Sequence, residues 1–532
     1  MVNMENVISF EKISKWSENK KGLYYIILIS VLLKLLLFIS ESTIDKDGLL
    51  YISAAQKFAA GHFKEGLSVF PMPFYPMLIS IVHFLIPDWV AAARVINIVF
   101  MVLALIPLYL FTEELFDKKA AFWACLAFAL APVQNGWADG VIRDPGFLFC
   151  MAWAVFFALR SSQSPKTILF VMAALFSWIS ILFRLEGIIF ALFFPIYILI
   201  LSFIKGQERA SLLKGALLFN MIPLFLVAVF FVYGWNEPVS FNRSEHIYSE
   251  FKSLFTAGFL ENYHTLTDQL KILTQSSPFP GLRNNFAEIA RHYVPAIYLF
   301  GLIETFIVVL YPLFVVPLIF SFKNSINKNR IFVLSIFWAF ILMDYYFLIK
   351  TDFLTSRYLS IPVLLMYPWI GAGMHRLFEY LSWKLSKKVF AALFLLFFIM
   401  PVYQCVEQEW KQDSSLMVAA KWMANNTKDN KLRIITTDNR FLFYAGREYL
   451  IKNASPGTNS DGFYSLDTKG SSYNELEQVA IKNKFDLIMF KISSKESVPQ
   501  FKHFKIIKEF KGRKNISYVF SSPEVTDKIG SI

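Results

Sequence analysis

Seven ionisable residues, spread over four parts of the chain, are the candidates for chemistry. They stand at the edges of long apolar runs, as Asp45 and Asp47, Arg143 and Asp144, Arg184 and Glu186, and Arg357. Ionisable side chains in such places are costly and are therefore functional candidates. Arginine offers phosphate oxygens a fork of donors, and a carboxylate can remove a hydroxyl proton as a new bond forms. The set predicts group transfer from a lipid-linked phosphate at a membrane surface.

The composition predicts a membrane protein around this set. Of the 532 residues, 56% are hydrophobic and 17% aromatic, and several runs reach the roughly 18 residues that span a hydrocarbon core. With three cysteines, two of them in apolar runs, we expect neither a disulfide framework nor a Cys-based metal site. The net charge of +12 comes largely from short loops between apolar runs, which indicates topology signals and not nucleic-acid binding.

The basic residues also predict how the chain crosses the membrane. Lysines before the first apolar run place residues 1–21 in the cytoplasm. The domain 22–404 then holds about eleven spans. These are expected near 22–40, 90–112, 119–134, 144–160, 166–183, 185–204, 212–234, 297–322, 331–349, 357–374 and 388–404. The loops 41–89 and 235–296 and the C-terminal region fall on the outer face of a multi-pass protein of the inner (plasma) membrane.

The loop 41–89 contains two short apolar segments, about 47–60 and 74–87. Each is too short to span comfortably and predicts an interfacial helix. A second interpretation makes 74–87 a short span and inverts everything after it, which would put Lys118, Lys119, Lys205 and Arg209 outside.

Residues 405–532 have the composition of a small soluble domain. The stretch "SSLMVAAKWMANNT" predicts an amphipathic helix. The stretches "KLRIITTD", "FDLIMFKIS" and "KNISYVFSS" predict strands. The expected fold class is therefore a mainly α, polytopic membrane protein with a small C-terminal α/β domain, placed in the periplasm.

Several segments, in this order, resemble a known family. They are "DGLLYISAAQKFAAGH", "FPMPFYPMLISIVHFL", "AARVINIVFMVLALIPLYLF", "AFWACLAFALAPVQNGWADGVIRDPGFLF", "RLEGIIFALFFP" and "SRYLSIPVLL". Over residues 20–375 the chain resembles the polytopic GT-C glycosyltransferases, which include the protein O-mannosyltransferases and the lipid A aminoarabinose transferases. The resemblance implies transfer of a hexosyl or pentosyl group, with inversion, from a polyprenyl-phosphate carrier at the outer face. The partners would be that lipid-linked donor and a glycan, lipid or protein acceptor of the cell envelope.

The resemblance also implies roles for individual residues. Asp47 matches the first-loop catalytic base, Asp144 the second-loop acid, and Arg357 a position associated with the lipid phosphate. Asp45, Arg143, Arg184 and Glu186 are the further candidates for substrate binding. Lys46 makes the motif "DKD", which leaves a divalent-metal-assisted reaction open beside one without a cofactor.

Structural roles explain some of the same residues. Asp144 precedes Pro145, which is an N-cap signature. Arg184 and Glu186 suit an ion pair between adjacent spans, and Asp45 suits a solvated position beside Asp47. These interpretations stay open at the level of the sequence.

Two other functions use similar charges. A transporter or flippase of lipid-linked sugars needs charges at mid-membrane depth and broken helices, and Lys34 and Asp344 are the main ionisable residues that we expect inside spans. A non-catalytic envelope assembly protein would stay active after Asp47→Asn. The sequence does not specify the sugar, the acceptor or the oligomeric state.

Overall fold

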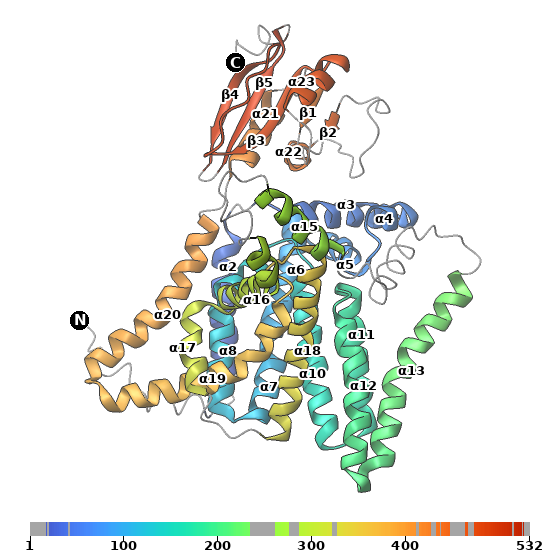
Figure 1. The fold of residues 1–532 in the computed structure, drawn as a ribbon, viewed down its shortest axis with the longest axis vertical. Coiled ribbons are helices and arrows are strands. Elements are labelled where there is room, and N and C mark those ends of the chain that lie inside the picture. The colour runs from blue at the N-terminus through green and yellow to red at the C-terminus, as the bar shows by residue number, and fades with distance from the viewer. Residues whose placement is uncertain are drawn as a thin grey trace.

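The computed structural model describes residues 18, 21–40, 43–234, 261–275, 287–321, 327–410, 414–426, 432–436, 438–446, 463–465, 473–512, 515–523 and 525. Within these ranges the chain forms a bundle of long helices, and a small sheet domain stands on one end of the bundle (Figure 1).

The bundle contains most of the helices. They are α2 (Lys21–Phe38), α6 (Trp89–Leu103), α7 (Leu105–Leu115), α8 (Lys118–Leu130), α9 (Pro132–Asp139), α10 (Asp144–Gln163), α11 (Thr167–Phe183), α12 (Gly187–Ile204), α13 (Arg209–Gly234), α16 (Ala287–Leu310), α17 (Val315–Ser321), α18 (Lys328–Thr351), α19 (Ser360–Lys384) and α20 (Lys387–Trp410).

Seven helical stretches in the described part of the chain are long and apolar enough to cross a membrane. They are Lys21–Phe38, Trp89–Leu115, Asp144–Gln163, Gly187–Ile204, His292–Leu310, Lys328–Thr351 and Lys387–Gln408. Three further apolar helices are shorter: Phe74–His83, Thr167–Phe183 and Pro312–Ser321. The predicted class of a mainly helical polytopic protein is therefore confirmed, whereas the predicted count of about eleven spans is not.

One difference from the predicted spans lies at 119–134. Ala131 is extended, with φ −65° and ψ 127°, because the residue before a proline avoids the α region. Helix α8 therefore ends at Leu130, and Pro132 begins the short helix α9 as a new element. The expected single span is two helices, and the second of them lines the cavity described below.

Helix α19 packs in the middle of the bundle, where two glycines allow close contact. A side chain at Gly371 would overlap the backbone of Ala120 and Ala124 on α8, and one at Gly373 would overlap the carbonyl of Pro317 on α17. Small residues at helix crossings let backbones approach in this way in membrane proteins. The packing at Gly371 leaves no space for a larger residue.

We expect Gly371→Leu to lower stability by about 1–3 kcal/mol, because overpacking forces backbone shifts. The measurement is the thermal unfolding midpoint in detergent. The matched control is Gly301→Leu on α16, where an added Cβ meets nothing within 4 Å. Equal midpoints for the two variants would contradict the close crossing of α8 and α19.

Three short helices lie at the end of the bundle that carries the sheet domain. They are α3 (Lys46–Ala59), α4 (Phe63–Val69) and α5 (Phe74–His83), and α3 runs across the ends of the long helices (Figure 1). Helix α3 buries Leu49, Tyr51, Ile52, Ala54, Ala55 and Phe58 in the main core, so one face is fixed to the bundle. The short apolar segments of the sequence correspond to α3 and α5, while α4 was not expected.

The segment 235–296, expected as a large polar loop, contains helical structure. Helix α15 (Glu261–Gln275) lies inside it, and α16 begins at Ala287, before the predicted boundary. Residues 235–260 and 276–286 lie outside the described residues.

The C-terminal domain contains α21 (Ser415–Asn426), β1 (Ile434–Thr436), α22 (Arg440–Tyr444), β2 (Phe463–Ser465), α23 (Tyr473–Lys482), β3 (Leu487–Ser493), β4 (Lys505–Lys511) and β5 (Asn515–Ser521). The strand order is β2-β1-β3-β5-β4; β1 pairs in parallel with β2 and β3, and β5 pairs antiparallel with β3 and β4. The predicted helix is α21, and the predicted strands are β1, β3 and β5. Strand β4 was missed because its side chains are mostly exposed and rich in Lys, as is typical of a protected sheet edge.

The expected boundary at 405 falls inside a helix. Helix α20 continues to Trp410, beyond the apolar run, because Glu407, Gln408 and Glu409 are good helix formers.

Candidate functional site

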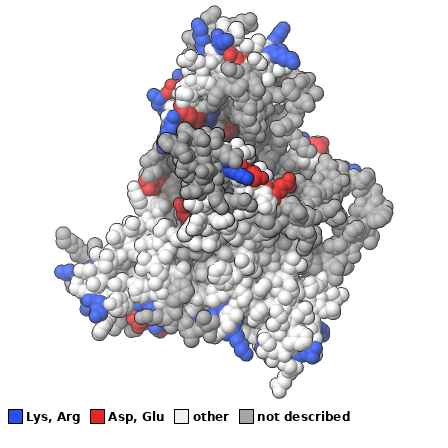
Figure 2. Space-filling model, viewed as in Figure 1, with Lys and Arg blue, Asp and Glu red and all other residues white. Residues whose placement is uncertain are grey.

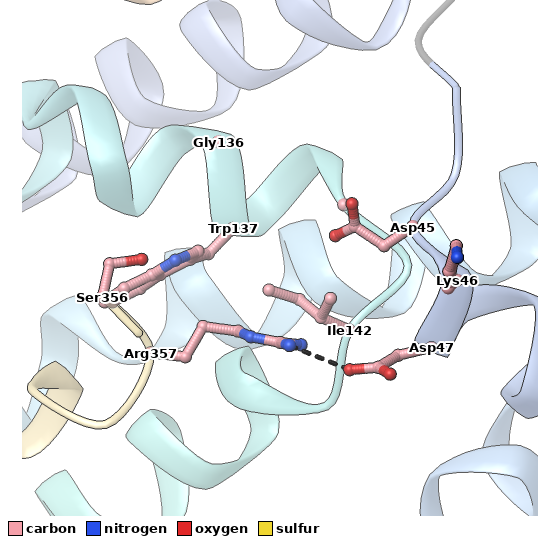
Figure 3. Close-up of a pocket in the computed structure, with 9 residues that line it drawn as sticks. Asp45, Lys46, Asp47, Gly136, Trp137, Ile142, Ser356 and Arg357 are labelled. Carbon is pink, nitrogen blue, oxygen red and sulfur yellow. Dashed lines mark hydrogen bonds and ion pairs between the residues drawn. The ribbon is translucent and has the colours of Figure 1, made fainter. Parts of the chain in front are cut away.

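A cavity of about 360 Å³ opens where α3, α9 and the segment before α19 meet (Figure 3). Its lining is formed by Asp45, Lys46, Asp47, Gly136, Trp137, Gly140, Ile142, Ser356 and Arg357. Charged side chains come from the start of α3 and from the segment 352–359, while Gly136 and Trp137 come from α9. The lining thus combines two carboxylates, two cations and an aromatic ring.

The start of α3 presents two of the predicted carboxylates. Asp45 is the N-cap residue, with an extended backbone, but its side chain makes no capping hydrogen bond. Asp47 lies in the first turn, where the positive end of the helix dipole favours a carboxylate. Both side chains therefore remain directed to the cavity (Figure 3).

Asp47 and Arg357 form an ion pair across the cavity. The Nη2 atom of Arg357 donates to Oδ2 of Asp47 at 2.8 Å, and the side chains are 29% and 43% exposed respectively. Burial lowers the pKa of Arg357, but the charges of Asp144 and Asp47 and the hydrogen bond to Asp47 raise it above its ordinary value. Arg357 therefore stays a cation, in reach of any anion that enters the cavity.

Behind the cavity, Arg184 joins two more of the predicted acids. Its Nη1 atom donates to Asp144, and its Nε atom donates to Oε1 of Glu186 at 3.1 Å. Asp144 is 1% exposed and Arg184 6%. Burial raises the pKa of Glu186, yet the charge and hydrogen bonds of Arg184 bring it below the ordinary value. This guanidinium ties together the ends of α10, α11 and α12.

The Asp47–Arg357 ion pair and the buried set around Arg184 are close enough to act on each other electrostatically. Burial raises the pKa of Tyr51 to about 12, and the charges of Arg143, Asp47, Asp144 and Arg357 all act on its hydroxyl. Asp144, however, does not line the cavity. Asp45, Asp47 and Arg357 therefore share one cavity, while Asp144 lies buried behind them with Arg184 and Glu186.

Asp144 does not act as the N-cap that its position before Pro145 suggested. Arg143 holds the N-cap position of α10, and Asp144 is its first helical residue. One carboxylate oxygen, Oδ1, accepts from Arg184, and the other, Oδ2, is buried without a hydrogen-bond partner among the described residues. The ion pair of Arg184 and Glu186 that the sequence left open is present.

Arg143 points away from the other acids, toward the segment between α4 and α5. Its Nη1 atom lies 2.8 Å from the Met72 sulfur, and its guanidinium lies 5.4 Å from the Phe70 ring. No carboxylate in the described part of the chain lies within ion-pair distance of it. Its charge nevertheless lowers the pKa of Glu186, after larger effects of burial and Arg184.

A buried ion pair that the sequence analysis missed supports the far wall of the cavity. Arg94 on α6 pairs with Asp139 at the end of α9 and also lies 3.4 Å from the carbonyl of Leu37. Asn97 donates to the carbonyls of Gly140 at 2.7 Å and Ile142 at 2.8 Å, and both of those residues line the cavity. The sequence does carry a signal for these contacts, since Arg94 and Asn97 interrupt the apolar run at "AARVIN". Arg94, near the start of the stretch Trp89–Leu115, adds an ionisable residue to Lys34 and Asp344.

The motif "DKD" left a metal-assisted reaction open, and the residues around it test that possibility. The described residues contain no group of three or more His, Cys, Asp or Glu that could hold a metal ion. In the cavity, Asp47 already bonds a guanidinium, which competes with a cation for its oxygens. The described residues that line the cavity therefore do not form a metal site.

No protein-family model matches the chain, and no curated protein matches it by sequence. The archaeal oligosaccharyltransferase AglB from Archaeoglobus fulgidus, in complex with an inhibitory peptide and a dolichol-phosphate, is similar over 91% of this chain and 70% of its own, at TM-score 0.50 and 14% identity. ArnT from Cupriavidus metallidurans is similar over 93% of this chain and 97% of its own at 12% identity, with TM-score 0.43 in the apo state and 0.42 when bound to undecaprenyl phosphate.

The likeness to AglB shows the fold and not the activity. The chain is a polytopic membrane protein with the GT-C fold, as its resemblance to GT-C glycosyltransferases implied. The conclusion about the fold rests on this comparison.

Proposed function

We propose that this protein is a membrane glycosyltransferase. It moves a monosaccharide, with inversion, from a polyprenyl-phosphate carrier to an acceptor of the cell envelope. The observation that carries the proposal is the pair of Asp47 and Arg357 in a cavity at one end of an apolar helix bundle. The pair places a base for a hydroxyl beside a ligand for a phosphate.

The chemistry is a single displacement at the anomeric carbon. The acceptor oxygen bonds to that carbon on the face opposite the phosphate, and the bond from the carbon to the phosphate oxygen breaks. The acceptor's hydroxyl proton passes to the carboxylate of Asp47, which acts as general base. The electron pair leaves with the polyprenyl phosphate, whose negative charge Arg357 stabilises.

The other predicted site residues have supporting roles in this proposal. Asp45 and Lys46 line the cavity beside Asp47 and meet the polar groups of the substrates. Arg143, which has no carboxylate within ion-pair distance in the described part of the chain, is a second cation for phosphate. The buried set of Asp144, Arg184 and Glu186 fixes the helix ends behind the cavity.

We propose that the cavity faces the outer side of the inner membrane and that the N-terminus is cytoplasmic. The turns between α7 and α8, α12 and α13, and α19 and α20 lie at the end of the bundle away from the sheet domain (Figure 1). They carry Lys118, Lys205 and Lys384 among other basic residues, and Figure 2 shows Lys and Arg at that end and on the sheet domain, with a largely uncharged surface between them. Basic loops mark the cytoplasmic side. Helix α5, at ten residues or about 15 Å, is too short to be the span that would invert this topology.

The direct test compares envelope glycans and lipids by mass spectrometry, from cells with the intact gene and cells without it. We expect one envelope component to lose the mass of one sugar when the gene is absent, and the lipid-linked sugar to accumulate. Unchanged masses, together with movement of lipid-linked sugar across vesicles that contain the purified protein, would replace the transferase with a transporter.

A bulky residue at Gly136 should block the cavity without disturbing the fold. Gly136 lies on helix α9, lines the cavity, and has nothing within 4 Å of the position of an added Cβ. We expect Gly136→Leu to keep its thermal unfolding midpoint, because leucine favours a helix over glycine by up to about 1 kcal/mol. Transfer should fall at least tenfold.

The control for this variant is Gly301→Leu, which also adds a side chain to a helix in open space. It should transfer sugar at the original rate. Normal transfer by Gly136→Leu would mean that the reaction takes place elsewhere.

A further inference from the structure

The C-terminal domain contacts the segment that leads into helix α3, which carries Asp47. The backbone of Ile44 is held at both of its polar groups by side chains of α22. Its N–H donates to the Tyr444 hydroxyl at 2.8 Å, and its carbonyl accepts from Nη1 of Arg440 at 3.0 Å. Ile44 is 4% exposed and directly precedes Asp45, the N-cap of α3. Residues 400 positions apart in the sequence thus meet at the edge of the cavity.

Arg440 is itself held in place by a second set of hydrogen bonds. Its Nε atom lies 2.9 Å from Oδ1 of Asp438, and its Nη2 atom lies 2.6 Å from Oδ2. Such a bidentate pair fixes the guanidinium plane as well as its position. The Nη1 atom is left directed at Ile44, so that Arg440 reaches α3 as a rigid extension of the domain.

The same short helix belongs to two hydrophobic cores. Tyr444 packs against the core of the C-terminal domain and also against the main core of the bundle, which Phe443 contacts as well. Burial raises the pKa of Tyr444, which keeps its hydroxyl neutral and able to accept from Ile44. Helix α22 therefore connects the sheet domain to the bundle at the place where the chain enters α3.

We infer that Arg440 and Tyr444 are positioning residues, which set the place of Asp47 by holding the backbone of Ile44. With residue 44 fixed, the first turn of α3 is fixed, and the carboxylate of Asp47 is held within hydrogen-bond reach of Arg357. The C-terminal domain is then part of the working site, although none of its described residues lines the cavity. The anchoring stands on the observed contacts alone, and its effect on catalysis rests on the proposed function.

Hydrogen exchange of the full chain in lipid nanodiscs tests the anchoring without any assay of activity. Tyr444→Phe removes only the oxygen that accepts from Ile44. A net hydrogen bond of about 1 kcal/mol corresponds to a factor of about five. We therefore expect exchange in the segment 43–50 to rise about fivefold or more. The control is Tyr518→Phe, which changes a buried tyrosine of strand β5 in the same domain. Equal exchange of this segment in the two variants would overturn the inference.

Faster exchange in β3 would show that Tyr444→Phe has unfolded the C-terminal domain. A second variant tests the inference in that case. Arg440→Lys keeps the charge but loses the fork that binds Asp438. It should speed exchange in segment 43–50 and leave β3 protected. The control is Arg433→Lys, which should leave exchange in segment 43–50 unchanged. The Arg433 guanidinium lies 5.1 Å from the Phe485 ring within the domain. If Arg440→Lys also leaves that segment unchanged, α22 does not position α3.

Transfer kinetics separate this inference from the proposed function. In a transferase, both variants should lower kcat at least tenfold and change the KM of the lipid donor less than twofold, because the ligand for the phosphate is intact. If the unmodified protein transfers no sugar, the proposed function fails while the exchange result still decides the anchoring. A tenfold rise in KM with unchanged kcat would assign α22 to substrate binding and not to positioning.

Discussion

Replacing Asp47 by Asn should reduce sugar transfer about 1,000-fold, which is the middle of the range for a general base. The amide keeps the shape of the carboxylate and can still accept from Arg357, so we expect the protein to fold and insert normally. The readout is the rate at which the sugar-bearing product forms, measured by mass spectrometry, beside the thermal unfolding midpoint.

The same variant makes a second, independent prediction about binding. Asp47 competes with phosphate for the guanidinium of Arg357. Undecaprenyl phosphate, used as a probe, should therefore bind Asp47→Asn at least as tightly as the unmodified protein. Loss of turnover without loss of binding would separate the base from the phosphate ligand.

A suitable control is Glu65→Gln on α4, an exposed acid paired with Lys57 at the same end of the bundle. It should transfer sugar normally. A normal rate for Asp47→Asn would mean that Asp47 is not the general base of the transfer.

Replacing Arg184 by Leu should cost about 3–5 kcal/mol of stability, because breaking a buried pair leaves an uncompensated charge. Asp144 would lose its only ion-pair partner in the described part of the chain, and Glu186 would lose its hydrogen bonds from Arg184. The free energy of unfolding can be measured by titration with SDS in mixed micelles.

Two comparisons sharpen this test. Arg160→Leu breaks an ion pair in which the arginine is 48% exposed, and it should cost about 1 kcal/mol or less. The double variant Arg184→Leu with Asp144→Asn should recover part of the lost stability, because a neutral amide needs no counter-charge. If Arg184→Leu costs no more than Arg160→Leu, the buried set behind the cavity does not hold the helix ends.

The fold class could be predicted from the sequence because it follows from composition and from the lengths of apolar runs. The number of spans could not, because hydropathy does not show where a helix breaks. The apolar run continues through Pro132, but helix α8 ends before it and helix α9 begins there. The edge of the C-terminal sheet was also missed, since the Lys-rich β4 lacks the alternation that marks a half-buried strand.

The candidate site was predicted in part for a similar reason. Acids and arginines beside apolar runs are visible in a sequence, and Asp47 and Arg357, 310 positions apart, do form an ion pair. The depth of each residue is not visible: Asp144 matches a family acid just as Asp47 does, but it lies buried behind the cavity. The contact of Tyr444 with Ile44 depends on how two domains dock, which no local pattern encodes.

The ion pair in the cavity has a consequence for the order of events in the proposed reaction. Before a donor arrives, the base and the phosphate ligand bind each other, so a water molecule meets a carboxylate that is already engaged. The phosphate of an incoming donor draws the guanidinium to itself, so that the base is freed as the sugar arrives. Such a site favours donor-first binding and little wasteful hydrolysis of the lipid-linked sugar.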